Sequence, residues 1–258
     1  MSRYIKSELY RLLRVKGTYL FVIISAVLLL SSNIILACVK LSDRSFPYAT
    51  TQFALSNVMT GMIFVLFLCI MVSNIVFSNE YSNHTMKNSV TFGITRSTLY
   101  FGKFITQVIY AMVAFILIIG LHVLSSYLLL ENSGADSLIM LLRICLICLP
   151  LFFFALGVTN CFAFLFEGSG ATISSSFGIM LALPLISNLL GMKFMVFKKL
   201  AEVMPYNMIN SIKFNFKENK FDTIWGANGF TYYWIIGIVE MILFVVWGYL
   251  FFRKREIK

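Results

Sequence analysis

The sequence predicts an all-α membrane protein with six transmembrane helices. Of its 258 residues, 59% are apolar and only 12% are charged, whereas about a quarter of the residues in an average soluble domain are charged. The mean hydropathy is +0.86. The apolar residues gather in runs of about 20, the length that a helix needs to cross a hydrocarbon core of roughly 30 Å. A soluble fold is excluded, because most of its surface would have to face water.

Two other classes are excluded by the same pattern. A transmembrane β-barrel would alternate in polarity over strands of about ten residues, and these runs do not alternate. The net charge of +10 does not indicate a nucleic-acid partner, because the basic residues lie at the ends of apolar runs and not in one patch.

Residues 1–17 predict an amphipathic helix that lies in the membrane interface. The apolar side chains of this segment share one helical face, and basic side chains point away from it (apolar: Ile5, Leu9, Leu12 and Leu13; basic: Arg3, Lys6 and Arg14). The alternative is an ordinary basic flank to the first span.

We expect one permease-sized domain over residues 1–258, with spans near 19–39, 57–77, 104–130, 138–165, 171–190 and 230–252. Pro150 and Pro184 should kink the fourth and fifth spans. An even number of spans places both termini on one side, and both are strongly basic, so both are expected in the cytoplasm. The loop 78–103 is then cytoplasmic and the loop 191–229 extracellular. Six lysines in the latter argue the other way, but the basic residues at the termini lie closer to span ends.

No motif for catalysis is found. The sequence has no GxxxxGK[ST], no HExxH and no GxSxG, and no set of acids or nucleophile and base lies at membrane depth. We therefore expect no enzyme activity, no cofactor and no metal in this chain. The remaining function classes are a channel, a carrier and a transport subunit that is driven by a partner protein.

The loop 78–103 is the most informative segment. It is too polar to span a membrane and too rich in aromatic and branched residues to be a free linker, so it favours a short helix with one face against a partner. Its order of residues resembles the cytoplasmic loop of ABC-2-type transporter permeases: an acid after span two, Gly-Thr, a Gly, an Arg three residues on, and Gly-Lys opening span three. The matching positions are Glu80, Thr85, Gly93, Arg96, Gly102 and Lys103, and His84 stands where the family usually has Gly.

The resemblance implies an ABC-2 permease fold like that of type V exporters. It also implies a function: the permease subunit of an ATP-binding-cassette exporter in the bacterial cell membrane, moving a peptide or amphiphile. Lantibiotic or bacteriocin immunity and peptide-export permeases are the most similar in size and arrangement. The implied partners are ATPase subunits, which hold ATP and Mg, and a second permease chain, identical or homologous.

The resemblance further implies a set of residues that couple the chain to the ATPase: Glu80, Tyr81, Thr85, Gly93, Arg96, Lys103 and Glu167. For Arg96 and Lys103, anchoring at lipid headgroups is an equal alternative. Glu80 is better interpreted as a helix cap or an internal ion pair. Glu167 lies in the second internal loop, for which a simple tight turn is the alternative.

Three polar residues at membrane depth are candidates for a substrate path: Glu240, Asn74 and Asn160. A charged acid near the bilayer centre costs about 2.5–3.5 kcal/mol on insertion scales, so Glu240 should face protein or water or be protonated. It either lines a path or bonds as a neutral acid to a polar group such as Asn33, Asn74, Asn160 or His122. A second function is therefore an ATPase-independent channel or proton-coupled carrier that uses Glu240. A third is a membrane anchor for a soluble enzyme.

Overall fold

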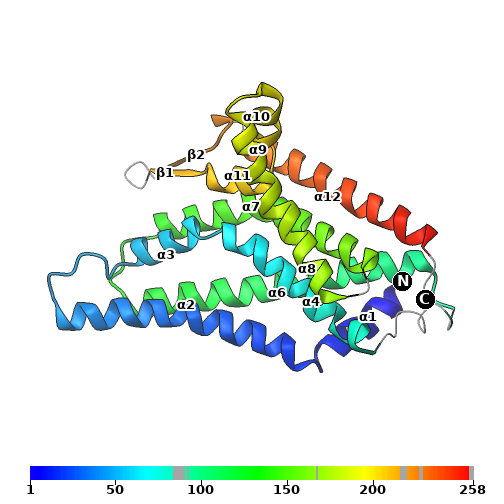
Figure 1. Ribbon diagram of the computed structural model, residues 1–258. Coiled ribbons are helices and arrows are strands. Elements are labelled where there is room, and N and C mark those ends of the chain that lie inside the picture. The colour runs from blue at the N-terminus through cyan, green and yellow to red at the C-terminus, as the bar shows by residue number, and fades with distance from the viewer. Residues whose placement is uncertain (84–90, 92, 167, 216–219, 227–228, 256–258) are drawn as a thin grey trace.

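The protein is a bundle of long helices, seen in a computed structural model that describes residues 1–258 except 84–90, 92, 167, 216–219, 227–228 and 256–258 (Figure 1). Side chains are also not described at 79–83 and 220. Five stretches in the described part are long and apolar enough to cross a membrane, and a bent helix pair makes a sixth. The all-α membrane fold class is confirmed. Both termini lie at the same end of the bundle (Figure 1), which we call the terminal end.

The N-terminal helix α1 (Ser2–Leu12) packs against α6, and a short break at 13–15 leads into α2 (Lys16–Ser42). The Thr18 hydroxyl donates to the Leu12 carbonyl at 2.8 Å and fixes the angle of this break. The inward side of α1 carries a polar residue as well as an apolar one. Leu13 is 60% exposed, whereas Glu8 and Leu12 are buried.

The second span is broken into α3 (Thr51–Thr60) and α4 (Ile63–Asn83), which meet at an angle of 63°. The break falls at Gly61, a residue type at which helices often kink. Just before it, the Thr60 hydroxyl donates to the main-chain carbonyls of Ser56 and Asn57, a contact that also bends helices. The span expected near 57–77 is thus formed by two helices, and the first begins earlier, at Thr51.

The third span, α6 (Arg96–Leu129), begins before the membrane segment that we expected at 104–130. Thr95 caps it, because its hydroxyl accepts a hydrogen bond from the Thr98 backbone N–H at 3.3 Å. The 34 residues of the helix extend over about 51 Å at 1.5 Å per residue. Residues 96–103, expected within the loop, are therefore helical and continue the span toward the terminal end.

The centre of the bundle is α7 (Asp136–Leu165), the most buried span, which packs most extensively on α12 (Gly229–Lys254). Glycines allow this approach: a Cβ at position 237 would lie 2.9 Å from the Pro150 carbonyl carbon, and a Cβ at position 157 would lie 3.1 Å from Val245 Cγ2. Small residues of this kind let membrane helices pack closely without a hydrophobic driving force.

The fifth span consists of α8 (Ser169–Phe177), a π-helical turn η1 (Gly178–Ala182) and α9 (Leu183–Gly191). The turn ends just before Pro184, which lacks a backbone N–H and cannot continue the regular hydrogen-bond pattern. The distortion that we expected at Pro184 takes this form.

The segment after the fifth span contains two short helices and a hairpin. These are α10 (Met195–Glu202), α11 (Pro205–Asn210), and the antiparallel pair β1 (Lys213–Asn215) and β2 (Lys220–Asp222). Helix α10 packs on α9, and α11 contacts α4 and η1. The hairpin and α3 lie away from the terminal end (Figure 1).

Candidate functional site

The terminal end of the bundle holds a group of basic side chains that bind other parts of the same chain. We call this group the basic junction; its members are Arg11, Arg96, Lys103 and Arg255. It lies where α1, α4, α6, α7 and α12 approach one another, and both ends of the loop between α4 and α6 reach it (Figure 1).

Within the junction, Lys103 is buried. Its side chain is only 1% exposed, and its Nζ lies 2.7 Å from Glu8 Oε2 on α1. Arg11 Nη2 lies 2.6 Å from the same oxygen and donates to the Val76 carbonyl on α4 at 3.0 Å. The Glu8 carboxylate thus binds two cations and joins α1 to α6, and Arg11 connects the pair to α4. Lys103 is enclosed by its own chain, and its ion pair with Glu8 ties α6 to α1.

The neighbouring residue, Gly102, lets α1 approach α6 closely. A Cβ at this position would lie 2.8 Å from Tyr4 Cε1, closer than such atoms come in real structures. Both residues of the Gly-Lys pair thus serve the packing of α1: Gly102 leaves room for Tyr4, and Lys103 binds Glu8.

Arg96, at the first turn of α6, holds the end of α12. Its Nη1 donates to the main-chain carbonyls of Arg253 at 2.6 Å and Arg255 at 2.8 Å. Arg255 in turn donates through Nη1 to the carbonyls of Phe164 at 2.9 Å and Leu165 at 2.8 Å, at the end of α7. The last carbonyls of a helix lack intrahelical partners and carry partial negative charge, so a guanidinium is well suited to them. The two arginines join α6, α12 and α7 in series.

Gly93 lies three residues before α6, on the surface, with a φ of +86°. Among the described residues, no atom outside its chain neighbours lies within 4 Å of the position of a Cβ there. A positive φ is the conformation for which glycine is favoured.

The remaining residues of the expected coupling set lie partly or wholly outside the described residues. The backbones of Glu80 and Tyr81 belong to the last turn of α4, but their side chains are not described. Thr85 and Glu167 are outside the described residues altogether. Their roles stay predictions.

At membrane depth, the structure does not bring the three candidate path residues together. Asn160 on α7 accepts a hydrogen bond from Gln107 Nε2 on α6 at 2.8 Å. Asn74 is half-buried on α4, and Glu240 lies on α12. The three belong to different helices, and no hydrogen bond joins any two of them among the residues that the structure describes.

Glu240 borders a pocket of about 160 Å³ between the fifth and sixth spans and the two short helices α10 and α11. Its Oε2 atom is buried and has no hydrogen-bond partner in the described part of the chain. A more open, polar hollow of about 620 Å³ is lined by neighbouring residues of α10 and α11, among them Glu202 and Asn207.

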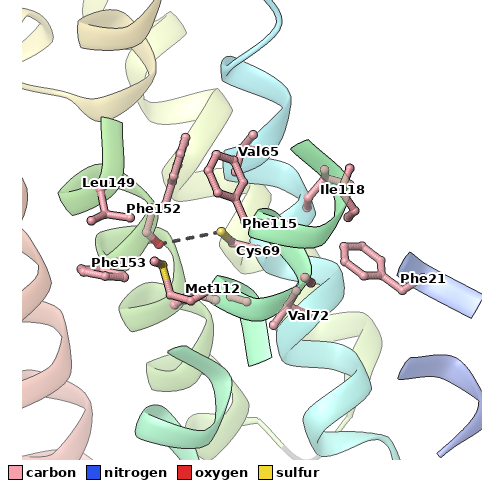
Figure 2. A pocket seen from close by; sticks show the side chains of 14 residues that line it. Phe21, Val65, Cys69, Val72, Met112, Phe115, Ile118, Leu149, Phe152 and Phe153 are labelled. Carbon is pink, nitrogen blue, oxygen red and sulfur yellow. Dashed lines mark hydrogen bonds between the residues drawn. The ribbon is translucent and has the colours of Figure 1, made fainter. Parts of the chain in front are cut away.

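A second pocket, of about 50 Å³, is lined almost entirely by apolar groups of α2, α4, α6 and α7 (Figure 2). Phe115 and Phe152 pack against each other beside it, with ring centroids 5.8 Å apart, and the Cys69 thiol donates to the Phe152 carbonyl at 3.8 Å. None of the described residues that line it is charged, so they offer no partner for a charged ligand.

A buried polar cluster joins α2, α3 and α6. Asn33 Nδ2 lies 2.7 Å from Ser125 Oγ and 3.3 Å from His122 Nδ1, and His122 Nε2 lies 3.4 Å from the Ala54 carbonyl. Asn33, His122 and Asn160 were considered as partners for Glu240, and the structure places hydrogen bonds of all three elsewhere. Among the described residues, no group of three His, Cys, Asp or Glu side chains is arranged to hold a metal ion.

Sequence reasoning missed Glu8 and Arg255 as members of the junction. Glu8 is the only acid among residues 1–17, and an isolated acid in a basic, membrane-facing helix is itself a sign of an internal partner. Arg255 gave no comparable sign, because its partners are main-chain carbonyls.

These features define a multi-pass α-helical membrane protein whose loops and helix ends are tied together on one side. Residues 4–183 match the profile of a family described as ABC-2 family transporter protein, and the chain belongs to that family. It is therefore a permease component of a transporter, and the expected ABC-2 permease is confirmed. No curated protein matches the chain.

Proposed function

We propose that this chain is the permease subunit of an exporter driven by ATP, which a separate ATPase subunit binds with Mg and hydrolyses. The ATPase docks at the terminal end, on the loop between α4 and α6. The observation that carries this proposal is the series of contacts from Arg96 to the end of α12 and from Arg255 to the end of α7. A partner that moves this loop moves three spans with it.

The physical requirement for such coupling is a stiff connection between the docking surface and the membrane helices. Coupling travels through packed elements and hydrogen-bond networks that have discrete arrangements. Here α6 begins at Arg96, only three residues beyond the exposed Gly93. Little flexible chain therefore separates the open surface of the loop from a helix that crosses the membrane.

The complete exporter contains a second permease chain, identical or homologous, because six helices rarely enclose a path for a large substrate. The substrate is a peptide or another amphiphile, as for a bacteriocin or lantibiotic. The protein lies in the bacterial cell membrane with both termini in the cytoplasm. The common location of the termini at one end supports this arrangement (Figure 1), as do the basic residues that flank both.

The test is purification of the chain from native membranes in a mild detergent, with mass spectrometry of the proteins that remain bound. We expect an ATPase with a P-loop to copurify. Gly93→Trp should abolish this, because the indole projects from the docking surface. Gly93→Asn is the matched control, since asparagine tolerates a positive φ and adds little bulk. Purification of the folded chain without any ATPase would refute the proposal.

A second candidate function is a proton-coupled carrier, and one observation favours it: Glu240 has a buried carboxyl oxygen with no partner among the described residues. The two functions differ in their energy source. Transport by a carrier should follow an imposed pH gradient in vesicles without ATP and should be lost in Glu240→Gln. Transport by the exporter should require ATP and continue when the gradient is collapsed.

A further inference from the structure

The pocket beside Glu240 combines one acid with apolar walls. Leu66, Phe154, Met180, Leu183 and Phe244 are among the residues that line it, and among the described lining residues Glu240 alone is charged. Glu240 is the eleventh residue after Gly229, so it lies about 16 Å along α12 at 1.5 Å per residue. The acid is thus far from both ends of the helix, where a charge is costly unless it has a partner.

The structure supplies no such partner for one of the two carboxyl oxygens. Glu240 Oε2 is buried without a hydrogen bond in the described part of the chain. Two of the partners considered from the sequence bond to other residues: the Asn33 amide to His122 and Ser125, and the Asn160 carbonyl oxygen to Gln107. A buried polar group of this kind normally has a partner, and its absence within a protein indicates a ligand or another unseen group.

The size of the pocket limits what that ligand can be. At about 160 Å³, it matches the class of apolar protein cavity of about 150 Å³ that binds benzene. The pocket therefore has room for one ring-sized or short alkyl group. A cation attached to such a group would meet Glu240 with its charge and the apolar walls with its carbon atoms.

The pocket also has access to the surface of the bundle. Leu183 on α9 and Leu200 on α10 line it, and their side chains are 41% and 44% exposed. An amphiphile can therefore reach the pocket from the side where Leu183 and Leu200 are exposed, without first crossing the polar hollow.

From charge, size and access together, we propose that this pocket binds the cationic group of an amphiphilic substrate. An ammonium or guanidinium would donate to Glu240 Oε2, and the attached apolar group would pack against Phe154, Met180 and Phe244. A lysine side chain of a peptide and a simple alkylammonium share this chemistry. The proposal names a substrate class for the exporter and in that respect rests on the proposed function.

The experiment measures binding to the purified chain in detergent by calorimetry, with 2-phenylethylammonium and its neutral counterpart 2-phenylethanol as probes. The ammonium should bind at least about tenfold more tightly than the alcohol, the size of one charge-assisted hydrogen bond. Glu240→Gln should remove this preference and leave the affinity for the alcohol unchanged. Glu202→Gln, a matched change in the neighbouring polar hollow, should preserve the preference.

A third variant, Met180→Trp, fills the pocket and should weaken binding of both probes. Equal affinities of the wild-type chain for the two probes would overturn the proposal. A preference that survives Glu240→Gln, or binding that is unaffected by Met180→Trp, would overturn it as well. No ATPase or ATP is present in this measurement. If the chain shows no preference for the ammonium but an ATPase copurifies, only the proposed binding site is refuted. If the preference is found but no ATPase copurifies, only the proposed exporter function is refuted.

Discussion

Lys103 and Glu8 form an ion pair inside the chain, with 2.7 Å between Nζ and Oε2. The pair connects the third span to the N-terminal helix across 95 residues of sequence. Arg11 shares the same carboxylate. Helix α1 is thus fastened to α6 by charge as well as by the close approach at Gly102.

We expect Glu8→Ala to destabilise the protein by about 3 kcal/mol, because breaking a buried ion pair by removing one partner leaves the other charge poorly compensated. The measurement is the free energy of unfolding of the purified protein in a denaturing detergent series. Lys6→Ala changes an exposed charge on the same helix and should alter stability by no more than about 0.5 kcal/mol. Similar effects of the two variants would contradict the burial of the pair.

Arg96→Ala should lower the rate of export without preventing the ATPase from binding. It removes the guanidinium that binds the carbonyls of Arg253 and Arg255, at a cost of about 2 kcal/mol for hydrogen bonds from a charged group. The exposed loop surface is unchanged, so the ATPase should still copurify while the rate of export falls.

The control for Arg96→Ala is Arg143→Ala, which removes an exposed arginine on α7. Export assays in cells, together with copurification, distinguish the two variants. If Arg96→Ala exported at the wild-type rate, the link from α6 to α12 would have no part in coupling.

Gly237→Ala should strongly destabilise the bundle. The added Cβ would lie 2.9 Å from the carbonyl carbon of Pro150, and backbone atoms cannot move aside without separating α7 from α12. Overpacking of a well-packed core costs about 1–3 kcal/mol. Gly120→Ala makes the same change on α6, where no atom lies within 4 Å of the added Cβ, and should leave the melting temperature unchanged or slightly higher. Thermal melting in detergent compares the two.

Asn33→Leu should weaken the contact between α2 and α6. The amide donates to Ser125 and to the His122 carbonyl, and its loss leaves buried acceptors unsatisfied at a cost of about 1–2 kcal/mol. Ser32→Leu changes the adjacent exposed residue, which bonds only to its own helix at Leu29, and should be nearly neutral. Equal melting temperatures for both variants would count against the cluster as a helix contact.

The membrane spans could be predicted from sequence because a single quantity, the length of an apolar run, determines whether a helix crosses the bilayer. The break in the second span could not. Its first helix begins with the polar residue Thr51, whose hydroxyl accepts from the Ser133 backbone N–H at 2.9 Å, a partner 82 residues away. The polar residues before position 57 therefore indicated a loop. In the folded chain they belong to a helix, because a distant residue supplies the hydrogen bond that Thr51 needs.

The basic junction was predictable only in part. The pattern around Arg96 and Lys103 identified the family, because glycine and basic residues recur there at fixed spacing. It did not identify what these side chains touch. Arg96 and Arg255 bind main-chain carbonyls, which every residue possesses, and Glu8 pairs with a residue that only the folded chain brings near. Such partners leave no periodic signal in a sequence.

The serial contacts at the terminal end have a mechanical consequence. Arg96 binds the end of α12, and Arg255 binds the end of α7. A force that acts on the start of α6 is therefore distributed over three long helices. We expect the helices to bend instead at their two irregular points, the 63° break at Gly61 and the π-helical turn before Pro184. Helices α6, α7 and α12 would then transmit movement, and the breaks in the second and fifth spans would absorb it.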